Sequence, residues 1–111
     1  MEREDAINKA FEIIAIGGDA KGMAYEALEL AEKGQFEEAD KLVKDSEQSL
    51  LEAHHIQTDL ISRTARGEDI PIDMLFVHGQ DHLMCAIEAQ SLIKHLIGLS
   101  KRIAELEAKL A

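Results

Sequence analysis

Clear helix-terminating signals occur at only two places in this chain. The first is the glycine in "EKGQ" (residues 32–35), and the second is "RGEDIP" (residues 66–71), where a glycine is followed by the single proline. Glycine commonly stands just past a helix C-terminus, and proline often follows it closely. The two signals leave three long segments, which we expect to be helices at about residues 3–32, 36–65 and 73–110.

The residue types between these breaks favour an all-α fold. Alanine, leucine, glutamate and lysine are abundant, and all four are strong helix formers. Each segment would form a helix about 45 Å long, and such short connections place neighbouring helices antiparallel. We therefore predict one domain, residues 1–111, folded as an antiparallel three-helix bundle.

The charge balance and the missing signals exclude several classes of protein. The chain has 22 acidic against 12 basic residues, whereas a nucleic-acid-binding protein normally needs a basic face. No apolar run approaches the roughly 18 residues of a transmembrane helix, and the charged "MEREDAINKA" at the N-terminus is not a signal peptide. Cys85 is the only cysteine, so it has no internal disulfide partner. We expect a cytoplasmic protein with no nucleic-acid partner and no direct membrane insertion.

The second and third segments carry apolar residues at alternating steps of three and four. The second segment has one such seam, through Phe36, Ala39, Val43, Ser46, Leu50, Ala53, Gln57, Leu60 and Thr64. The third has two. Its first stripe contains Leu75, His78, His82, Cys85, Ala89, Leu92, Leu96, Leu99, Ile103, Leu106 and Leu110, and its second contains Phe76, Leu83, Ala86, Ile93 and Ile97. Two stripes are more than two neighbouring helices easily cover, and with 4% aromatic residues the core is thin. We infer that the third helix also faces a second chain.

The first segment is interrupted by Gly17, Gly18 and Gly22, each of which costs a helix about 1 kcal/mol relative to alanine. One interpretation is a kink or a close helix crossing. The other is space for a phosphoryl group or a neighbouring subunit.

The stretch "FVHGQDHLMC" (residues 76–85) contains the main candidate site. His78 and His82 are four residues apart and share one broad helix face with Asp81. They could be hydrogen-bonded core residues that fix the helix register. They could bind a metal, although Gly79 stands where the HExxH motif has its glutamate. They could also include a nucleophile, because a neutral imidazole nitrogen can attack phosphorus. Spacing alone does not choose among these.

Other polar residues are weaker candidates. Gln57 falls on the seam of the second helix, where we expect it to hydrogen-bond a buried group. His54 lies one step from that seam, within reach of an active site. We expect His55 and His95 to be solvated.

Three stretches together resemble the lactose/cellobiose-type enzyme IIA family of the bacterial phosphoenolpyruvate-dependent sugar phosphotransferase system. They are "VHGQDHLM" (77–84), "EAHHIQTDLI" (52–61) and "GDAKGMAYEALELAEKGQFEEADKLV" (18–43). The resemblance implies a homotrimer of three-helix subunits, a nine-helix assembly. It also implies a disaccharide of the cellobiose/chitobiose or lactose type.

The resemblance further implies the roles of individual residues. His78 would accept a phosphoryl group from the carrier HPr on its Nε2 (tele) nitrogen and pass it to a cysteine of the cognate IIB protein, which works with the membrane component IIC. His82 would support the transfer. Apart from the resemblance, the added negative charge calls for hydrogen-bond donors, and His82, Gln57 and, more weakly, His54 are the candidates, from the same or a neighbouring subunit. Asp81 would bind a divalent metal ion such as Mg²⁺ at the trimer axis, shared by three subunits, in a structural role.

Three other interpretations compete with this resemblance. A non-enzymatic, metal-stapled helical oligomerisation module would leave His78 without chemistry. A histidine-phosphotransfer domain would be a four-helix bundle with a lysine soon after the histidine, which this chain lacks. A metal-storage bundle would need several carboxylate–histidine pairs on different helices, and the sequence shows one such cluster.

Overall fold

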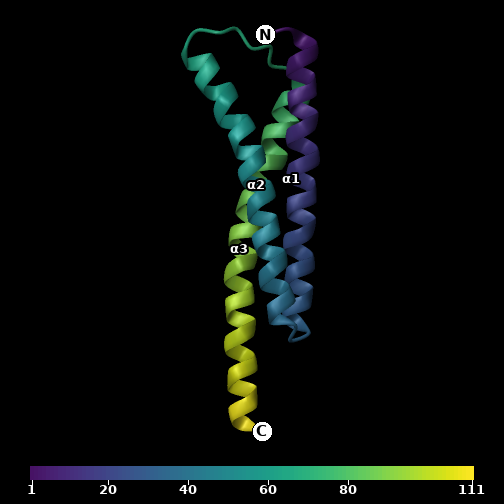
Figure 1. Cartoon of the computed structure of the whole chain (residues 1–111), viewed down its shortest axis with the longest axis vertical. Coiled ribbons are helices and arrows are strands. Elements are labelled where there is room, and N and C mark those ends of the chain that lie inside the picture. Colours follow the sequence, from purple (N-terminus) through teal and green to yellow (C-terminus); the bar gives the residue numbers. More distant parts are fainter.

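The computed structural model describes residues 1–111, and it consists of three long α-helices. They are α1 (Arg3–Glu32), α2 (Phe36–Ala65) and α3 (Met74–Leu110). The helices run antiparallel in chain order and form a rod of 63 × 21 × 19 Å (Figure 1). The predicted three-helix bundle is confirmed, and only the start of α3 differs, by one residue. None of the helices is long and apolar enough to cross a lipid bilayer.

The two predicted helix-terminating glycines end α1 and α2 as expected. Gly34 has a φ of 80°, and the next backbone N–H, that of Gln35, donates to the Leu30 carbonyl at 2.9 Å. Gly67, with a φ of 94°, repeats this arrangement after α2. In both places a left-handed residue lets the chain turn while it satisfies carbonyls at the helix end.

The start of α3 is set by local chemistry. Pro71 has no backbone N–H, and its ring disfavours a helical conformation for the residue before it. Two residues later, the Asp73 carboxylate accepts a hydrogen bond from the Phe76 backbone N–H at 3.1 Å, as an N-cap. Arg3 of α1 lies 3.8 Å from the same carboxylate. These contacts fix the start of α3. His78 lies just beyond the first turn of this helix.

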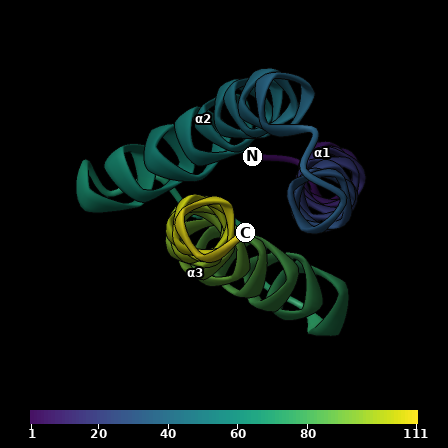
Figure 2. The same cartoon turned by 90° about the horizontal axis from the view of Figure 1, so that it is seen from below.

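The buried face of α1 consists mainly of small residues. Its members are Ala6, Ala10, Ile13, Gly17, Ala20, Ala24, Ala27 and Ala31. Small side chains allow close approach, and both α2 and α3 pack along α1 more extensively than along each other. Seen end-on, α1 points almost along the line of sight, whereas α2 and α3 are tilted across it (Figure 2). Near Ala65, α2 leans away from α1 and from the beginning of α3 (Figure 1).

The glycines of α1 do not interrupt the helix, which is continuous from Arg3 to Glu32. Gly17 is buried, and a Cβ built on it would lie 3.8 Å from the Leu83 Cα atom of α3. Gly17 therefore marks the close helix crossing that was one of the two sequence interpretations. Gly18 and Gly22 are exposed, and a Cβ on either would contact nothing within 4 Å.

The apolar seams differ in what they face. The predicted seam of α2 is buried from Ala39 to Leu60. On α3, the stripe through Phe76, Leu83 and Ile93 is buried against the bundle. The other stripe is exposed along the second half of α3 at Leu92, Leu96, Leu99, Ile103, Leu106 and Leu110. The sequence predicts that two neighbouring helices cannot cover both stripes of α3. In the single chain, one stripe is indeed left exposed.

We predict opposite effects for alanine at two glycines. Gly18→Ala should raise the free energy of unfolding by about 1 kcal/mol, because alanine is the better helix former and meets no neighbour. Gly34→Ala should lower it by about 1 kcal/mol, because alanine is strained at positive φ. Urea denaturation followed by circular dichroism measures both. If both variants changed the free energy of unfolding in the same direction, the helical conformation of Gly18 or the left-handed conformation of Gly34 would be wrong.

Candidate functional site

The first three turns of α3 are held from one side by α1. Gly79 is buried there, and a Cβ built on it would lie only 3.3 Å from the Ala10 carbonyl oxygen. Leu83, one turn later, is fully buried on the same side. Because these residues fix which side of α3 faces the bundle, His78 lies on the outer side and is exposed.

His78 and His82 form an aromatic pair at this outer side. Their ring centroids are 4.4 Å apart with an interplanar angle of 79°, an edge-to-face arrangement. His82 is half-buried, and His78 lines an open groove with Met74, Leu75, Val77 and Asp81. The first interpretation of the sequence required both histidines to be core residues. In the single chain they are not. The exposed ring is open to a reaction partner.

Asp81 is exposed beside the histidines. Its Oδ1 atom accepts a hydrogen bond from the Cys85 thiol at 3.6 Å. Within the chain, no three histidine, cysteine or acidic side chains converge to hold a metal ion. Asp81 does lie on the same helix face as the exposed Leu92 and Leu99, three turns and more further on. Asp81 therefore continues the line of the exposed apolar stripe toward the start of α3.

Gln57 is buried on the seam of α2 and makes a hydrogen bond across to α3, although its partner is half-buried and not buried as expected. The partner is Gln80 of α3: the Gln57 Nε2 group donates to the Gln80 Oε1 atom, and it also lies 3.8 Å from the Met84 sulfur. Gln80 and Met84 are on the side of α3 away from His78, so the structure does not bring Gln57 to the histidine pair.

The other histidines lie apart from His78 within the chain. His54 lines a shallow groove with Ile87 and Gln90, further along α3. His55 and His95 are exposed, as expected.

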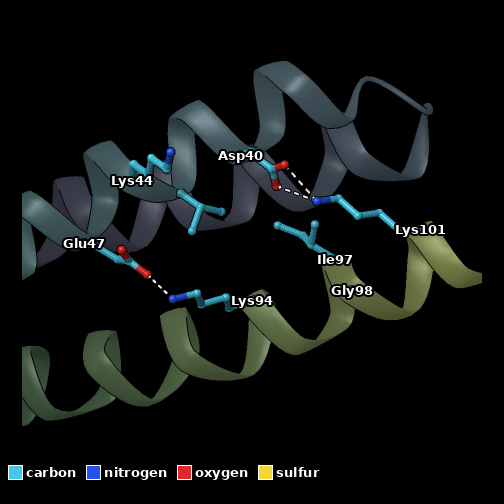
Figure 3. Close-up of a pocket in the computed structure, with 8 residues that line it drawn as sticks. Asp40, Lys44, Glu47, Lys94, Ile97, Gly98 and Lys101 are labelled. Atoms are coloured by element: carbon cyan, nitrogen blue, oxygen red, sulfur yellow. Dashed lines mark hydrogen bonds and ion pairs between the residues drawn. The ribbon is translucent and has the colours of Figure 1, made fainter.

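A charged groove between α2 and α3 was not foreseen from the sequence. Lys101 lies 2.8 Å from Asp40, and Lys94 pairs with Glu47 (Figure 3). The hydrogen bond from Lys94 lowers the pKa of Glu47. The sequence does contain a signal for this groove. The two acids are seven residues apart on α2 and the two lysines seven apart on α3, which aligns them across antiparallel helices.

An apolar groove lies where α2 leans away from α3. It is lined by Leu60, Ile61, Thr64, Ala65, Ile70, Ile72, Phe76 and Gln80. Sequence patterns did not indicate it, because it depends on the divergence of two helices. It borders the turns of α3 that carry His78.

Comparisons with known proteins agree with the motifs. Residues 8–101 match the protein family described as "PTS system, Lactose/Cellobiose specific IIA subunit". The lactose-specific EIIA component of Lactococcus lactis subsp. lactis is 45% identical over 105 residues, which are 95% of this chain and 100% of that protein. The corresponding component of Streptococcus mutans is 43% identical, over 92% of this chain and 98% of its own length.

Solved structures show the same fold. The cellobiose-specific enzyme IIA from Bacillus anthracis superposes with a TM-score of 0.88 at 39% identity, covering 95% of this chain and 94% of that one. A IIA(chitobiose)–HPr complex from the diacetylchitobiose branch of the Escherichia coli phosphotransferase system superposes with a TM-score of 0.76 at 34% identity. That match covers 94% of this chain and 98% of the other.

The Glu47–Lys94 pair predicts a pH-dependent stability. Because the pKa of Glu47 is lowered below 4.5 in the folded state, the pair stabilises the fold above about pH 4.5, and this is lost as the pH falls through the folded pKa. Lys94→Met should therefore lower the thermal midpoint near neutral pH, and the difference from the unmodified protein should shrink in acid. Lys41→Met, an exposed control on α2, should show no such trend. A difference independent of pH would contradict the assignment.

Proposed function

Since this chain belongs to the lactose/cellobiose-specific IIA family of the phosphotransferase system, we propose that it is a phosphocarrier with His78 as its acceptor. The observation that carries this proposal is the exposed His78 ring, which lies in an open groove with the His82 ring 4.4 Å away. An acceptor must be reached by both a donor and a recipient protein, and an imidazole buried in the bundle would be closed to both.

The proposed reaction consists of two transfers. The neutral His78 imidazole attacks phosphorus through Nε2, a nitrogen–phosphorus bond forms, and the bond from phosphorus to the donor breaks. In the second transfer, a cysteine thiolate of the IIB protein attacks the same phosphorus, and the imidazole leaves. Histidine suits both steps because the phosphorylated ring is a good leaving group.

The electrostatics of the site favour a transient phosphoryl group. Phosphorylation adds about two negative charges to a protein whose formal charge is already −10. Asp81 lines the same groove, and no lysine or arginine does. The nearby His82 would donate a hydrogen bond to the phosphoryl oxygens. A group held so lightly leaves readily, whereas strong ion pairs would stop the relay.

The comparisons support HPr as the donor, because a relative of the same fold has been solved in complex with it. The recipient is then the cognate IIB protein, which phosphorylates the sugar as the membrane component IIC imports it. The names of the relatives include lactose, cellobiose and chitobiose systems, which supports a disaccharide as the transported class.

We further propose a homotrimer held by the exposed stripe of α3. Leu92, Leu96, Leu99 and Ile103 form an apolar surface of the kind that a parallel helix of another subunit covers. In a symmetric trimer this would bring three Asp81 carboxylates near one axis, where a divalent cation with oxygen ligands relieves their repulsion. The metal would stabilise the assembly and take no part in the transfer.

We predict that the protein gains one acid-labile phosphoryl group per chain. The test mixes it with phosphoenolpyruvate, enzyme I, HPr and magnesium and measures intact mass before and after acid treatment. His78→Ala should abolish the gain, because it removes the nucleophile, while His54→Ala and His95→Ala should retain it.

Two results would contradict the proposal. One is the absence of any mass gain with active HPr, which would favour the metal-stapled oligomerisation module instead. The other is a full gain in the His78→Ala variant, which would move the acceptor to another residue.

The metal proposal predicts a fixed stoichiometry. The purified protein should sediment as a trimer at micromolar concentration and carry one divalent cation per three chains by elemental analysis. Asp81→Asn should lose the cation, because a neutral amide is a much weaker ligand, whereas Asp19→Asn on the exposed face of α1 should keep it. A cation retained by Asp81→Asn, or a monomer in the centrifuge, would exclude this site.

A further inference from the structure

We propose that Gln57 and Gln80 are a positioning pair, which sets the rotation of α3 about its own axis and so aims His78 outward. This inference rests on the proposed role of His78 as phosphoryl acceptor. The hydrogen bond between the two amides is on the side of α3 away from the histidines. The pair therefore acts through the helix and does not touch the reacting ring.

The faces of α3 explain how one hydrogen bond can control the helix. Successive residues are about 100° apart around a helix, so Gln80 points about 160° away from His78. Between these two directions, Gly79 and Leu83 face α1. If α3 rolled on α1, the Gln80 side and the His78 side would move in opposite senses. Holding Gln80 therefore holds His78.

The contact with α1 already sets which side of α3 is buried, mainly through the fully buried Leu83. One turn earlier, nearer His78, Gly79 has no side chain to interlock, and it lies directly against the backbone of Ala10. At that turn the contact limits the distance between the two helices more than small rotations. A directional hydrogen bond from a third helix adds a constraint on such rotations there.

Apart from the contacts of Gln57 with Gln80 and with the Met84 sulfur, no polar contact between α2 and α3 lies near His78. The ion pairs of Lys94 and Lys101 with α2 belong to the other half of the bundle, and Lys94 is about 21 Å along the helix from Gln80. Toward its C-terminal end α2 leans away from the beginning of α3 (Figure 1). The apolar groove lined by Leu60, Ile70 and Phe76 lies there. The glutamine pair is thus the last polar link between the two helices before the active end.

The chemistry of the pair suits this position. Gln57 is only 9% exposed, so an unpaired amide there would be costly, and the bond is strongly favoured. Both side chains are also neutral. An ion pair at this place would respond to the charge that His78 gains and loses, whereas an amide pair holds the helix equally in both states.

The test compares Gln57→Met, Gln80→Met and the double variant, because methionine keeps the length of glutamine but cannot make the bond. Each single variant should unfold at a lower temperature, since one amide is left unpaired, and the double variant should recover much of that loss. The maximal rate of single-turnover phosphorylation by phospho-HPr should fall about tenfold in all three, because small misplacements of a nucleophile cost rate.

Further readouts separate positioning from other roles. The final extent should stay at one phosphoryl group per chain, and the half-saturating HPr concentration should not change. Gln48→Met, a control at an exposed glutamine of α2, should alter neither stability nor rate.

Three outcomes would overturn the inference. If the rate recovered together with stability in the double variant, the pair would be only structural. If only the half-saturating concentration changed, Gln80 would be a docking contact in the apolar groove. Normal rates in every variant would remove the positioning role yet leave the phosphocarrier function intact. By contrast, an unmodified protein that accepts no phosphoryl group would exclude both proposals.

Discussion

The close packing of small side chains along α1 is the constraint on which the rest of the molecule depends. Six alanines and Gly17 line its buried face, so α2 and α3 both approach it closely. This arrangement packs the helices densely, but each small side chain buries little apolar area. A chain built this way has a narrow core, and the second apolar stripe of α3 lies outside it. An exposed apolar surface of this size is typical of an interaction site.

The same packing determines where chemistry can occur. Gly79 brings α3 against α1, and the neighbouring outer flank of the helix then carries the exposed His78 and the half-buried His82. The two halves of the α2–α3 contact differ in kind. Charged pairs join the helices far from the histidines, and a neutral amide pair joins them nearby. This distribution keeps the lysine ion pairs between α2 and α3 in the half of the bundle away from His78.

Much of the fold and part of the site could be predicted from local patterns. Gly34, Gly67 and Pro71 act through the backbone of their own neighbourhoods, so the helix boundaries were readable directly. The spacing of His78, Asp81 and His82 placed them on one face for the same reason. The partner of Gln57 was not predictable, because many polar residues of α3 were equally available. The ion pairs of Asp40 and Glu47 were in principle detectable, since matched heptad spacings occur on both helices.

The sequence by itself determined three helices, their ends, the two apolar stripes of α3 and the histidine motif. All of these follow from short-range rules of backbone conformation and helical periodicity. Only the tertiary structure decided which stripe is buried and which is left exposed, and it separated Gln57 and His54 from His78. Both stripes have the same period and are apolar along the second half of α3, so periodicity does not distinguish them there. The choice was made by the contact of Gly79 and Leu83 with α1, which is a property of two segments that are distant in sequence.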